Sequence, residues 1–389
     1  MHRTPVRYLT ITIALVASLL GQRPNFAPPK LFPAGSDPSF AVVADFNDDG
    51  NSDLAIANVG YSSSVGTVTI LLGNGNGGFS LAGSNAVGTA GGVLAVADFN
   101  GDGKLDIVST SGGLSILLGN GDGTFQPSTS LSLEAGPAWV TTGDFNRDGK
   151  QDLAVTFSDQ GVSVLLGNGD GTFQAPTFYR TQSYPGQVIA ADFNGDGNLD
   201  LALFAEGGID LPAASARNSP RAGVSVLLGR GDGTFSKPVH YTTGINPESL
   251  AAYDFRGDGR LDLVVSQAGQ FPTPGSVRVL PGNGDGTFRK PRTFASGIAG
   301  GSLALADFNG DGKIDLAIGD GSGTARGTFW IVPGRGDGSF GKPVAYTVAG
   351  DSSQIWNLAV GAFTRAKAPA LVVPEPQSGE VALLVDRPR

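Results

Sequence analysis

The chain carries six copies of one acidic nine-residue motif. One copy, Asp98–Asp106, reads Asp-Phe-Asn-Gly-Asp-Gly-Lys-Leu-Asp. The copies begin at Asp45, Asp98, Asp144, Asp192, Asp254 and Asp307, at intervals of 46 to 62 residues. A motif that recurs at such an interval predicts a repeat fold in which every copy supplies one supersecondary unit.

Five copies place carboxylate or amide oxygens at positions 1, 3, 5 and 9, the Asp254 copy does so at positions 1, 5 and 9, and all six have a glycine at position 6. Alternate residues of a tight turn point toward a common centre, and a hard cation such as Ca²⁺ takes several oxygen ligands at close range. Glycine permits the sharp turn. With the carbonyl of position 7 added, the predicted calcium ligands are Asp45, Asn47, Asp49, Asn51, Asp53, Asp98, Asn100, Asp102, Lys104, Asp106, Asp144, Asn146, Asp148, Lys150, Asp152, Asp192, Asn194, Asp196, Asn198, Asp200, Asp254, Asp258, Arg260, Asp262, Asp307, Asn309, Asp311, Lys313 and Asp315.

A simpler interpretation is a hairpin turn in which Asp and Asn only cap backbone amides. Three carboxylates in each of six copies make up 18 of the 35 acidic residues, and without a cation they repel one another. The pattern therefore favours calcium with a structural role, so that a chelator lowers the melting temperature. The Asp254 copy has Arg256 at position 3, which removes an oxygen and adds a positive charge. We expect weaker binding there, and five to six ions in all.

The rest of each repeat predicts β-strands only. The chain contains 60 Gly and 24 Pro, and short Val, Leu, Ile and Ala runs alternate with Gly, Asn and Asp clusters. In the first repeat, strands are expected at 40–46, 54–58 and 67–72, followed by a glycine-rich turn and a fourth strand. The fourth strand opens with Phe-x-x-Pro, and proline lacks a backbone donor, so this strand is expected at the outer edge of its sheet.

A seventh, degraded repeat predicts how the array closes. Residues 357–363 align with the first strand of the other repeats, but Ala362, Thr364, Ala366 and Ala370 fill the ligand positions, so no calcium is expected there. This repeat reaches only its third strand, 381–385, and residues 26–32 match a fourth strand. We therefore predict an all-β, seven-bladed β-propeller of four-stranded blades over residues 22–389, closed by the N-terminal strand. Fourteen of the 22 phenylalanines fall at two positions of the repeat and are expected to anchor the blades.

Residues 1–21 have the pattern of an export signal. Arg3 and Arg7 precede an apolar run over residues 8–20, which is short for a membrane span. An uncleaved anchor is the alternative, and no later segment is predicted to cross a membrane. The chain has no cysteine, so bound calcium would replace disulfides as the stabilising cross-link of an exported protein. The predicted location is secreted, periplasmic or at the cell surface, as a monomer.

These repeats resemble the FG-GAP/VCBS family of calcium-loop propellers, which includes the head of integrin alpha chains and many exported bacterial proteins. The segment Val162–Phe173, Val-Ser-Val-Leu-Leu-Gly-Asn-Gly-Asp-Gly-Thr-Phe, is close to the bacterial consensus, and the likeness covers residues 24–389. The resemblance implies the seven-bladed fold and calcium. It does not imply one function, because the fold carries adhesins, lectin-like proteins and a few enzymes.

Two other motifs have simpler explanations. The Gly-Asn-Gly-Asp-Gly turn could cradle phosphate, but no helix follows it, so turn residues with positive φ between strands are preferred. Arg-Gly-Asp occurs at 230–232, 256–258 and 335–337, where sister repeats carry Asn-Gly-Asp or a similar sequence. Drift within the repeat explains these tripeptides better than cell adhesion does.

Recognition is expected on the face formed by the loops between the second and third strands and by the connections between blades, because these segments vary. The candidate ligand-binding residues are Tyr61, Tyr184, Glu206, Asp210, Arg217, Arg221, Phe271, Arg326 and Trp356.

A net charge of −9 argues against nucleic acid as a partner. We predict a non-catalytic binding or adhesion module for a protein or glycan. The alternative is a carbohydrate-active enzyme using carboxylates such as Glu206 and Asp210; His240 is the only histidine beyond residue 2.

Overall fold

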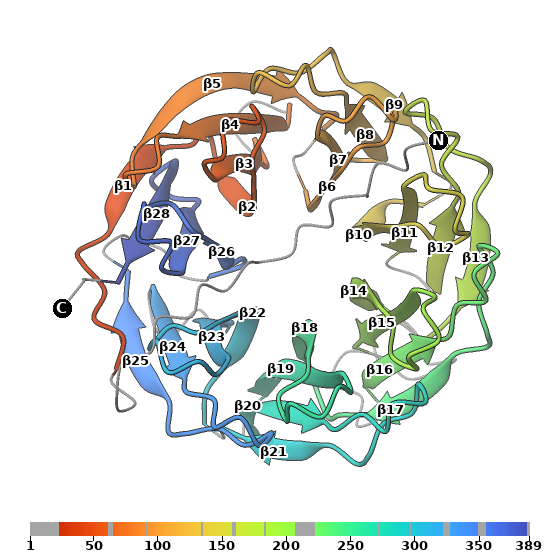
Figure 1. Cartoon of the computed structure of the whole chain (residues 1–389), viewed down its shortest axis with the longest axis vertical. Coiled ribbons are helices and arrows are strands. Elements are labelled where there is room, and N and C mark those ends of the chain that lie inside the picture. The colour runs from red at the N-terminus through yellow and green to blue at the C-terminus, as the bar shows by residue number, and fades with distance from the viewer. Residues whose placement is uncertain are drawn as a thin grey trace, which may run out of the picture.

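The computed structural model is a ring of seven four-stranded antiparallel sheets (Figure 1). It describes residues 23–60, 65–89, 92–133, 135–157, 161–182, 184–206, 222–270, 273–295, 297–321, 327–348 and 355–386. The first strand of each blade lines the centre of the ring and the fourth lies at the rim. The predicted seven-bladed propeller is therefore confirmed. In the described ranges, no helix has the length and apolar character that a membrane span requires.

Every blade follows the strand order expected from the repeat. Blades 1 to 3 are β2 (Pro38–Ala44), β3 (Asp53–Asn58), β4 (Thr67–Gly73), β5 (Phe79–Ala86); β6 (Leu94–Ala97), β7 (Asp106–Thr110), β8 (Leu114–Leu117), β9 (Thr129–Leu131); and β10 (Pro137–Gly143), β11 (Asp152–Phe157), β12 (Gly161–Leu165), β13 (Thr177–Arg180). Blades 4 and 5 are β14 (Pro185–Ala191), β15 (Asp200–Ala205), β16 (Gly223–Leu227), β17 (Val239–Thr242); and β18 (Pro247–Tyr253), β19 (Asp262–Gln270), β20 (Thr273–Leu280), β21 (Arg292–Phe294). Blade 6 is β22 (Gly300–Ala306), β23 (Asp315–Asp320), β24 (Thr328–Val332) and β25 (Val344–Thr347).

Blade 7 combines the two ends of the chain. It consists of β26 (Ala359–Gly361), β27 (Ala370–Glu375), β28 (Glu380–Val385) and, at its rim, β1 (Lys30–Pro33). The predicted closing strand is confirmed, but its continuous part is shorter than 26–32. Phe26 forms only an isolated bridge to Asp386, because Pro28 and Pro29 supply no backbone donors between them. Blade 7 therefore has four strands like the other blades, and the ring is closed.

The outer strands are confirmed as the edges of the blades, with one correction to the role of proline. Pro176 and Pro238 stand directly before β13 and β17, rather than within these strands. The second strands, in contrast, are buried at every position in the six blades whose second strands are fully described, because each is covered by a neighbouring blade on both sides. Period-two alternation is therefore absent from these central strands.

Phenylalanine pairs join neighbouring blades, as the sequence predicted. The ring of Phe46 in blade 1 meets that of Phe125 in blade 2, edge to face, at 5.8 Å between centroids. Five further junctions repeat this contact at 5.3 to 5.7 Å, with interplanar angles of 66° to 71°. At the same junction the amide of Gly123 donates to the carbonyl of Phe46, so each glycine-rich turn docks on the acidic loop of the preceding blade.

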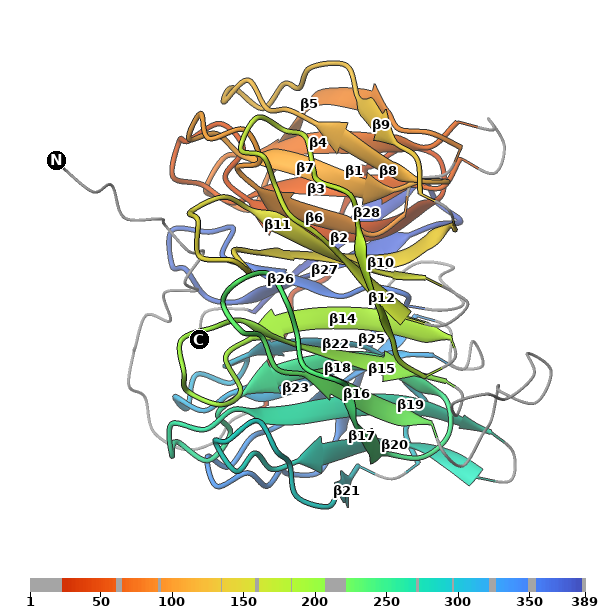
Figure 2. The same ribbon diagram turned by 90° about the vertical axis from the view of Figure 1, so that its right-hand side faces the viewer.

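The connecting segments lie at two opposite faces of the disc (Figure 2). The acidic-loop face holds the turns from first to second strand and from third to fourth strand of each blade. The variable-loop face holds the turns from second to third strand and the connections between blades. All six acidic motifs therefore lie on one face, and Tyr184, Glu206 and Trp356, the predicted recognition residues in the described ranges, belong to segments of the other.

Candidate functional sites

The ninth residue of each acidic motif is a buried structural bridge. Asp53 is fully buried; its Oδ2 accepts the amide of Phe46 at 2.8 Å and its Oδ1 the amide of Gly73 at 2.7 Å. It thus ties the acidic loop to the glycine-rich turn of its own blade. The same two bonds recur at Asp106, Asp152, Asp200 and Asp315.

Burial makes these carboxylates costly to ionise. It raises the pKa of Asp53, Asp106, Asp152 and Asp200 to about 6, although the two amide hydrogen bonds lower it. For Asp315, burial raises the pKa to about 7. The carboxylates at positions 1 and 5 of the same loop add to the increase. A bound cation would favour the ionised form of all three groups.

The remaining polar side chains fold the loop around itself. In the Asp98 copy, Asp98 accepts the amides of Gly101 and Gly103, and Asn100 accepts the amide of Asp102. These are the capping bonds of the simpler interpretation, and they are present in the structure. Across the described ranges, no three His, Cys, Asp or Glu side chains converge at metal-holding distance. Calcium therefore stays a prediction.

Position 7 is a lysine in the Asp98 and Asp144 loops. A Cβ added to Gly121 in the glycine-rich turn would lie 3.0 Å from Cδ of Lys104, and one added to Gly169 would lie 3.1 Å from Cδ of Lys150. These side chains therefore lie over the turn of their own blade. That position 7 contributes a backbone oxygen to calcium stays a prediction.

The fifth loop contains its own cation. Arg256 Nη2 lies 2.8 Å from Oδ1 of Asp262, and Nη1 lies 3.0 Å from Oδ2 of Asp258. The same Nη2 also donates to the carbonyl of Gly282 at 2.8 Å. A positive group thus fits between the position-5 and position-9 carboxylates of this loop, and it is held by the oxygens that a metal ion would need.

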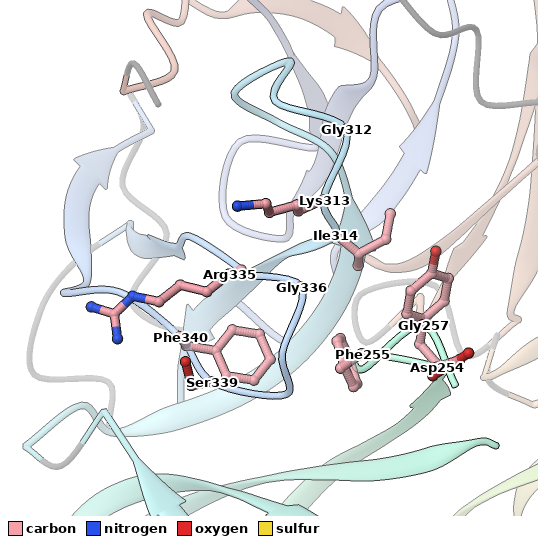
Figure 3. A pocket seen from close by; sticks show the side chains of 12 residues that line it. Asp254, Phe255, Gly257, Gly312, Lys313, Ile314, Arg335, Gly336, Ser339 and Phe340 are labelled. Atoms are coloured by element: carbon pink, nitrogen blue, oxygen red, sulfur yellow. The ribbon is translucent and has the colours of Figure 1, made fainter. Parts of the chain in front are cut away.

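A pocket of about 240 Å³ lies on the acidic-loop face at the junction of blades 5 and 6 (Figure 3). Asp254 and Phe255 line it from blade 5, and Lys313, Arg335 and Phe340 line it from blade 6. The rings of Phe255 and Phe340 meet at 5.3 Å. The pocket is thus one instance of the repeated blade junction.

The glycine-rich turns have the conformation that the sequence predicted. Gly121 and Gly123 adopt φ of 79° and 83°, and Asp122 accepts the amide and hydroxyl of Thr124. Two of the Arg-Gly-Asp tripeptides occupy this same turn. There Asp232 is bonded to Thr234 and Asp337 to Ser339, and the third tripeptide contains the Arg256–Asp258 ion pair. All three aspartates are engaged within the repeat.

Aliphatic and aromatic side chains line the central channel, together with the polar Thr141, Thr142 and Gln187. The channel has a volume of about 420 Å³ and is lined by residues of β2, β6, β10, β14 and β26, with no carboxylate among them. Phe40 and Trp139, from blades 1 and 3, contact each other edge to face at 5.4 Å. Polar side chains cap the inner strand edges: Asn357 accepts the amide of Ala41, and Gln187 accepts that of Leu250.

Three of the predicted recognition residues lie in the described ranges. The amide of Glu206 donates to the carbonyl of Tyr184 at 3.2 Å, so these two meet at the variable-loop end of β14 and β15 in blade 4. Trp356 lies in the connection before β26 with 62% of its surface exposed. Tyr184 has a φ of 56° and precedes a proline, as do Asp37 and Asn246. Its backbone therefore serves a turn that recurs between blades. The others, Tyr61, Asp210, Arg217, Arg221, Phe271 and Arg326, fall outside the described residues.

Sequence reasoning missed Glu248, near the start of β18. Burial raises the pKa of Glu248 to about 7, and the neighbouring charge of Glu206 adds to the increase. The two glutamates are far apart in sequence and belong to different blades, so no local signal could have paired them. Glu206 and Glu248 are therefore neighbouring carboxylates on the variable-loop face, and the predicted partner Asp210 falls outside the described residues.

Comparison with protein families identifies the repeats. The FG-GAP-like repeat family matches residues 45–109, 98–155, 144–203, 207–265 and 268–318, together more than half of the chain. The chain belongs to this family. No curated protein matches its sequence.

Solved structures share the fold. The chain resembles BBS1N, solved in complex with ARL6DN and soaked with lead, with a TM-score of 0.59 and 11% identity over 94% of this chain and 98% of that one. It also resembles Saccharomyces cerevisiae Sqt1, with a TM-score of 0.58 and 11% identity over 95% and 100% of the two chains. At this identity the likeness concerns the fold alone.

Proposed function

We propose that this FG-GAP repeat protein is an exported, calcium-stabilised, non-catalytic binding propeller that recognises a protein or glycan through its variable-loop face. The observation that carries the proposal is the chemical difference between the two faces. On the acidic-loop face the same aspartate recurs in six blades and bonds to backbone amides. On the variable-loop face the buried polar groups differ from blade to blade, and Asn58 Oδ1, Gln267 Nε2 and Glu375 Oε1 have no hydrogen-bond partner among the described residues.

Two arguments support calcium. The donor set at positions 1, 3, 5 and 9 consists of oxygens, which calcium prefers. Arg256 further indicates that the space between two of these carboxylates suits a positive charge. Because Arg256 already pairs with Asp258 and Asp262, we propose five calcium ions, bound by the Asp45, Asp98, Asp144, Asp192 and Asp307 loops. Export rests on the pattern of residues 1–21, and N-terminal sequencing of the protein from outside the cytoplasm tests it.

The binding test uses one variant on each surface. Calcium-loaded protein is screened on a glycan array and against purified cell-surface proteins. Trp356→Ala removes an exposed aromatic from the variable-loop face, and Phe178→Ala removes one from the outer strand β13, where it is 55% exposed. We expect a hit that weakens at least tenfold in Trp356→Ala and is unchanged in Phe178→Ala. Equal loss in both variants would contradict recognition by the variable-loop face.

A carbohydrate-active enzyme is the second candidate, and the Glu206–Glu248 pair favours it. A carboxyl group with a pKa near 7 beside a second carboxylate has the chemistry of a general acid and its partner. Hydrolysis of a polysaccharide panel that is abolished by Glu248→Gln would establish this activity. No turnover from folded, calcium-loaded protein would leave the binding function as the better account.

A further inference from the structure

An arginine and a glutamine converge at the junction of blades 4 and 5, on the variable-loop side. Gln267 on β19 and Arg278 on β20 lie on the same side of blade 5, because they pair across the strands with Ser276 and Val265 respectively. Val265 packs in a core cluster together with residues of blade 4 such as Val224. The two polar side chains therefore face blade 4.

Gly244, in the connection from β17 to β18, is where the two polar tips meet. A Cβ added to Gly244 would lie 3.0 Å from Nε2 of Gln267 and 3.2 Å from Nη2 of Arg278. The amides of Thr243 and Gly244 both donate to the carbonyl of Ala222, which fixes the backbone of the connection. The missing side chain of Gly244 thus leaves the amide and the guanidinium side by side.

Several of these polar groups lack partners. Oε1 of Gln267 accepts the hydroxyl of Ser276 at 3.2 Å, but its Nε2 has no acceptor, although Gln267 is only 3% exposed. Nε of Arg278 has none either, and within the described ranges no carboxylate forms an ion pair with Arg278. The hydroxyl of the fully buried Thr243 is likewise unpartnered. Buried polar groups are almost always hydrogen-bonded, so this set calls for an acceptor.

The repeat itself does not require this arginine. The matching position on the third strand holds Thr69, Ser115, Ser163 and Ser225 in blades 1 to 4. A charged side chain at this position adds a free-energy cost of desolvation, and burial lowers the pKa of Arg278. The guanidinium nevertheless keeps its charge, because arginine is not deprotonated in proteins. A feature that carries this cost in one blade only is more readily explained by binding than by folding.

We propose that Arg278 and Gln267 form a subsite for the carboxylate of an acidic side chain on a protein partner. Nε and Nη2 of arginine form a planar fork that matches the two oxygens of a carboxylate, and Gln267 Nε2 adds a third donor. The donors are recessed, so a carboxylate on a slender aliphatic stem reaches them better than one attached directly to a sugar ring. This inference adds a ligand class to the proposed binding function. It rests on that function, because it assumes that the variable-loop face recognises the partner.

The test follows the Arg278 Nε–Hε signal in ¹H–¹⁵N spectra of the calcium-loaded protein. Arg278→Ser identifies the signal and is expected to fold, since serine occupies this position in sister blades. Acetate and an N-acetylglutamate amide should shift the signal saturably in the millimolar range, whereas chloride at equal ionic strength should not. Gln267→Ala, which copies Ala205 of blade 4, should weaken binding about threefold to tenfold.

Arg292→Ser, an exposed arginine of the same blade, is the matched control and should bind the anions like the wild type. Tighter binding of glucuronate or sulfate than of the glutamate derivative would overturn the assignment to an acidic side chain. An equal shift by chloride, or no saturable shift, would overturn the subsite itself. Because the probes are small anions, this failure is distinguishable from a failure of the glycan and protein screens.

Discussion

The two ends of the second strand of each blade are equally buried but chemically different. At the acidic-loop end, six blades place the same aspartate, each with no exposed surface. Five residues further along, at the variable-loop end, the blades carry Asn58, Ser111, Phe157, Ala205, Gln267, Asp320 and Glu375, all buried. Burial therefore does not set the residue type by itself. The aspartate is required because it joins two turns, whereas the far end is free to differ between blades.

The same two ends of the second strand also differ in their hydrogen bonds. Both oxygens of Asp53 accept backbone amides, so this end of β3 is satisfied from within the blade. At the other end Asn58 bonds through Nδ2 to the hydroxyls of Thr67 and Thr69, but its Oδ1 has no partner. We interpret the first end as scaffold and the second as the region from which recognition is built.

Removing calcium from the acidic-loop end should produce the largest change in the stability of the protein. A ligand that binds only the folded state stabilises it by about 2.7 kcal/mol per site at 100 times its Kd. With five sites, chelation should lower the melting temperature by at least about 10 °C, measured by calorimetry with and without EDTA. Excess calcium should reverse the shift and magnesium should not, since calcium accepts the irregular oxygen set more readily. An unchanged melting temperature would contradict structural calcium.

Substitutions at the two ends of β3 should give the next largest difference, measured as the loss of unfolding free energy. Asp53→Ala leaves two buried amides without acceptors, at about 1–3 kcal/mol each, and also removes a predicted calcium ligand. Asn58→Ala removes two side-chain hydrogen bonds and should cost about 1–2 kcal/mol. Denaturant unfolding of both variants measures the difference. Equal losses in calcium would show that the acidic-loop end has no special structural role.

The effect of pH on the stability of the calcium-free protein should be smaller than the effects of these substitutions. Its direction is unusual, because the stability should fall as the pH rises. The folded-state pKa of about 6 at Asp53, Asp106, Asp152 and Asp200 lies above the value of about 3.9 for an unfolded aspartate. The folded state therefore binds more protons between these values, and its stability should fall as the pH rises from about 4 to about 7. Saturating calcium should reverse this trend, because it favours the ionised carboxylates. A rising melting temperature without calcium would contradict the contribution of these groups.

The sequence predicted the ring because its signals are local and repeated. Gly103 at position 6, Phe99 beside the first aspartate and Phe125 after the glycine-rich turn each perform one task that few other residues perform. What it could not predict depends on the direction that a side chain takes within its blade and on contacts between blades. Nothing near Arg256 shows that its guanidinium reaches Asp262 and Gly282. Likewise, Gly244 meets Arg278 only once blades 4 and 5 are side by side.

Proline and the site aspartates illustrate the same limit. The sequence predicts the proline before β17 within the strand, because it does not show where pairing begins. The oxygen atoms of the ninth aspartate predict a metal ligand, and they do not show that it also joins two turns. Its two bonds to backbone amides connect the loop with a turn that begins 13 to 29 residues later, as between Asp106 and Gly119 or Asp200 and Gly229.

The count of calcium ions in the wild-type protein and in Arg256→Asn tests the central claim most directly. Dialysed protein, equilibrated with calcium, is analysed by native mass spectrometry. Five ions per wild-type chain are expected, and a sixth in Arg256→Asn, which restores the asparagine found in sister loops and frees Asp258 and Asp262. No bound ions in the wild type, or the same count in both proteins, would contradict the assignment of the acidic-loop face as a calcium-bound scaffold in which Arg256 stands in for one ion.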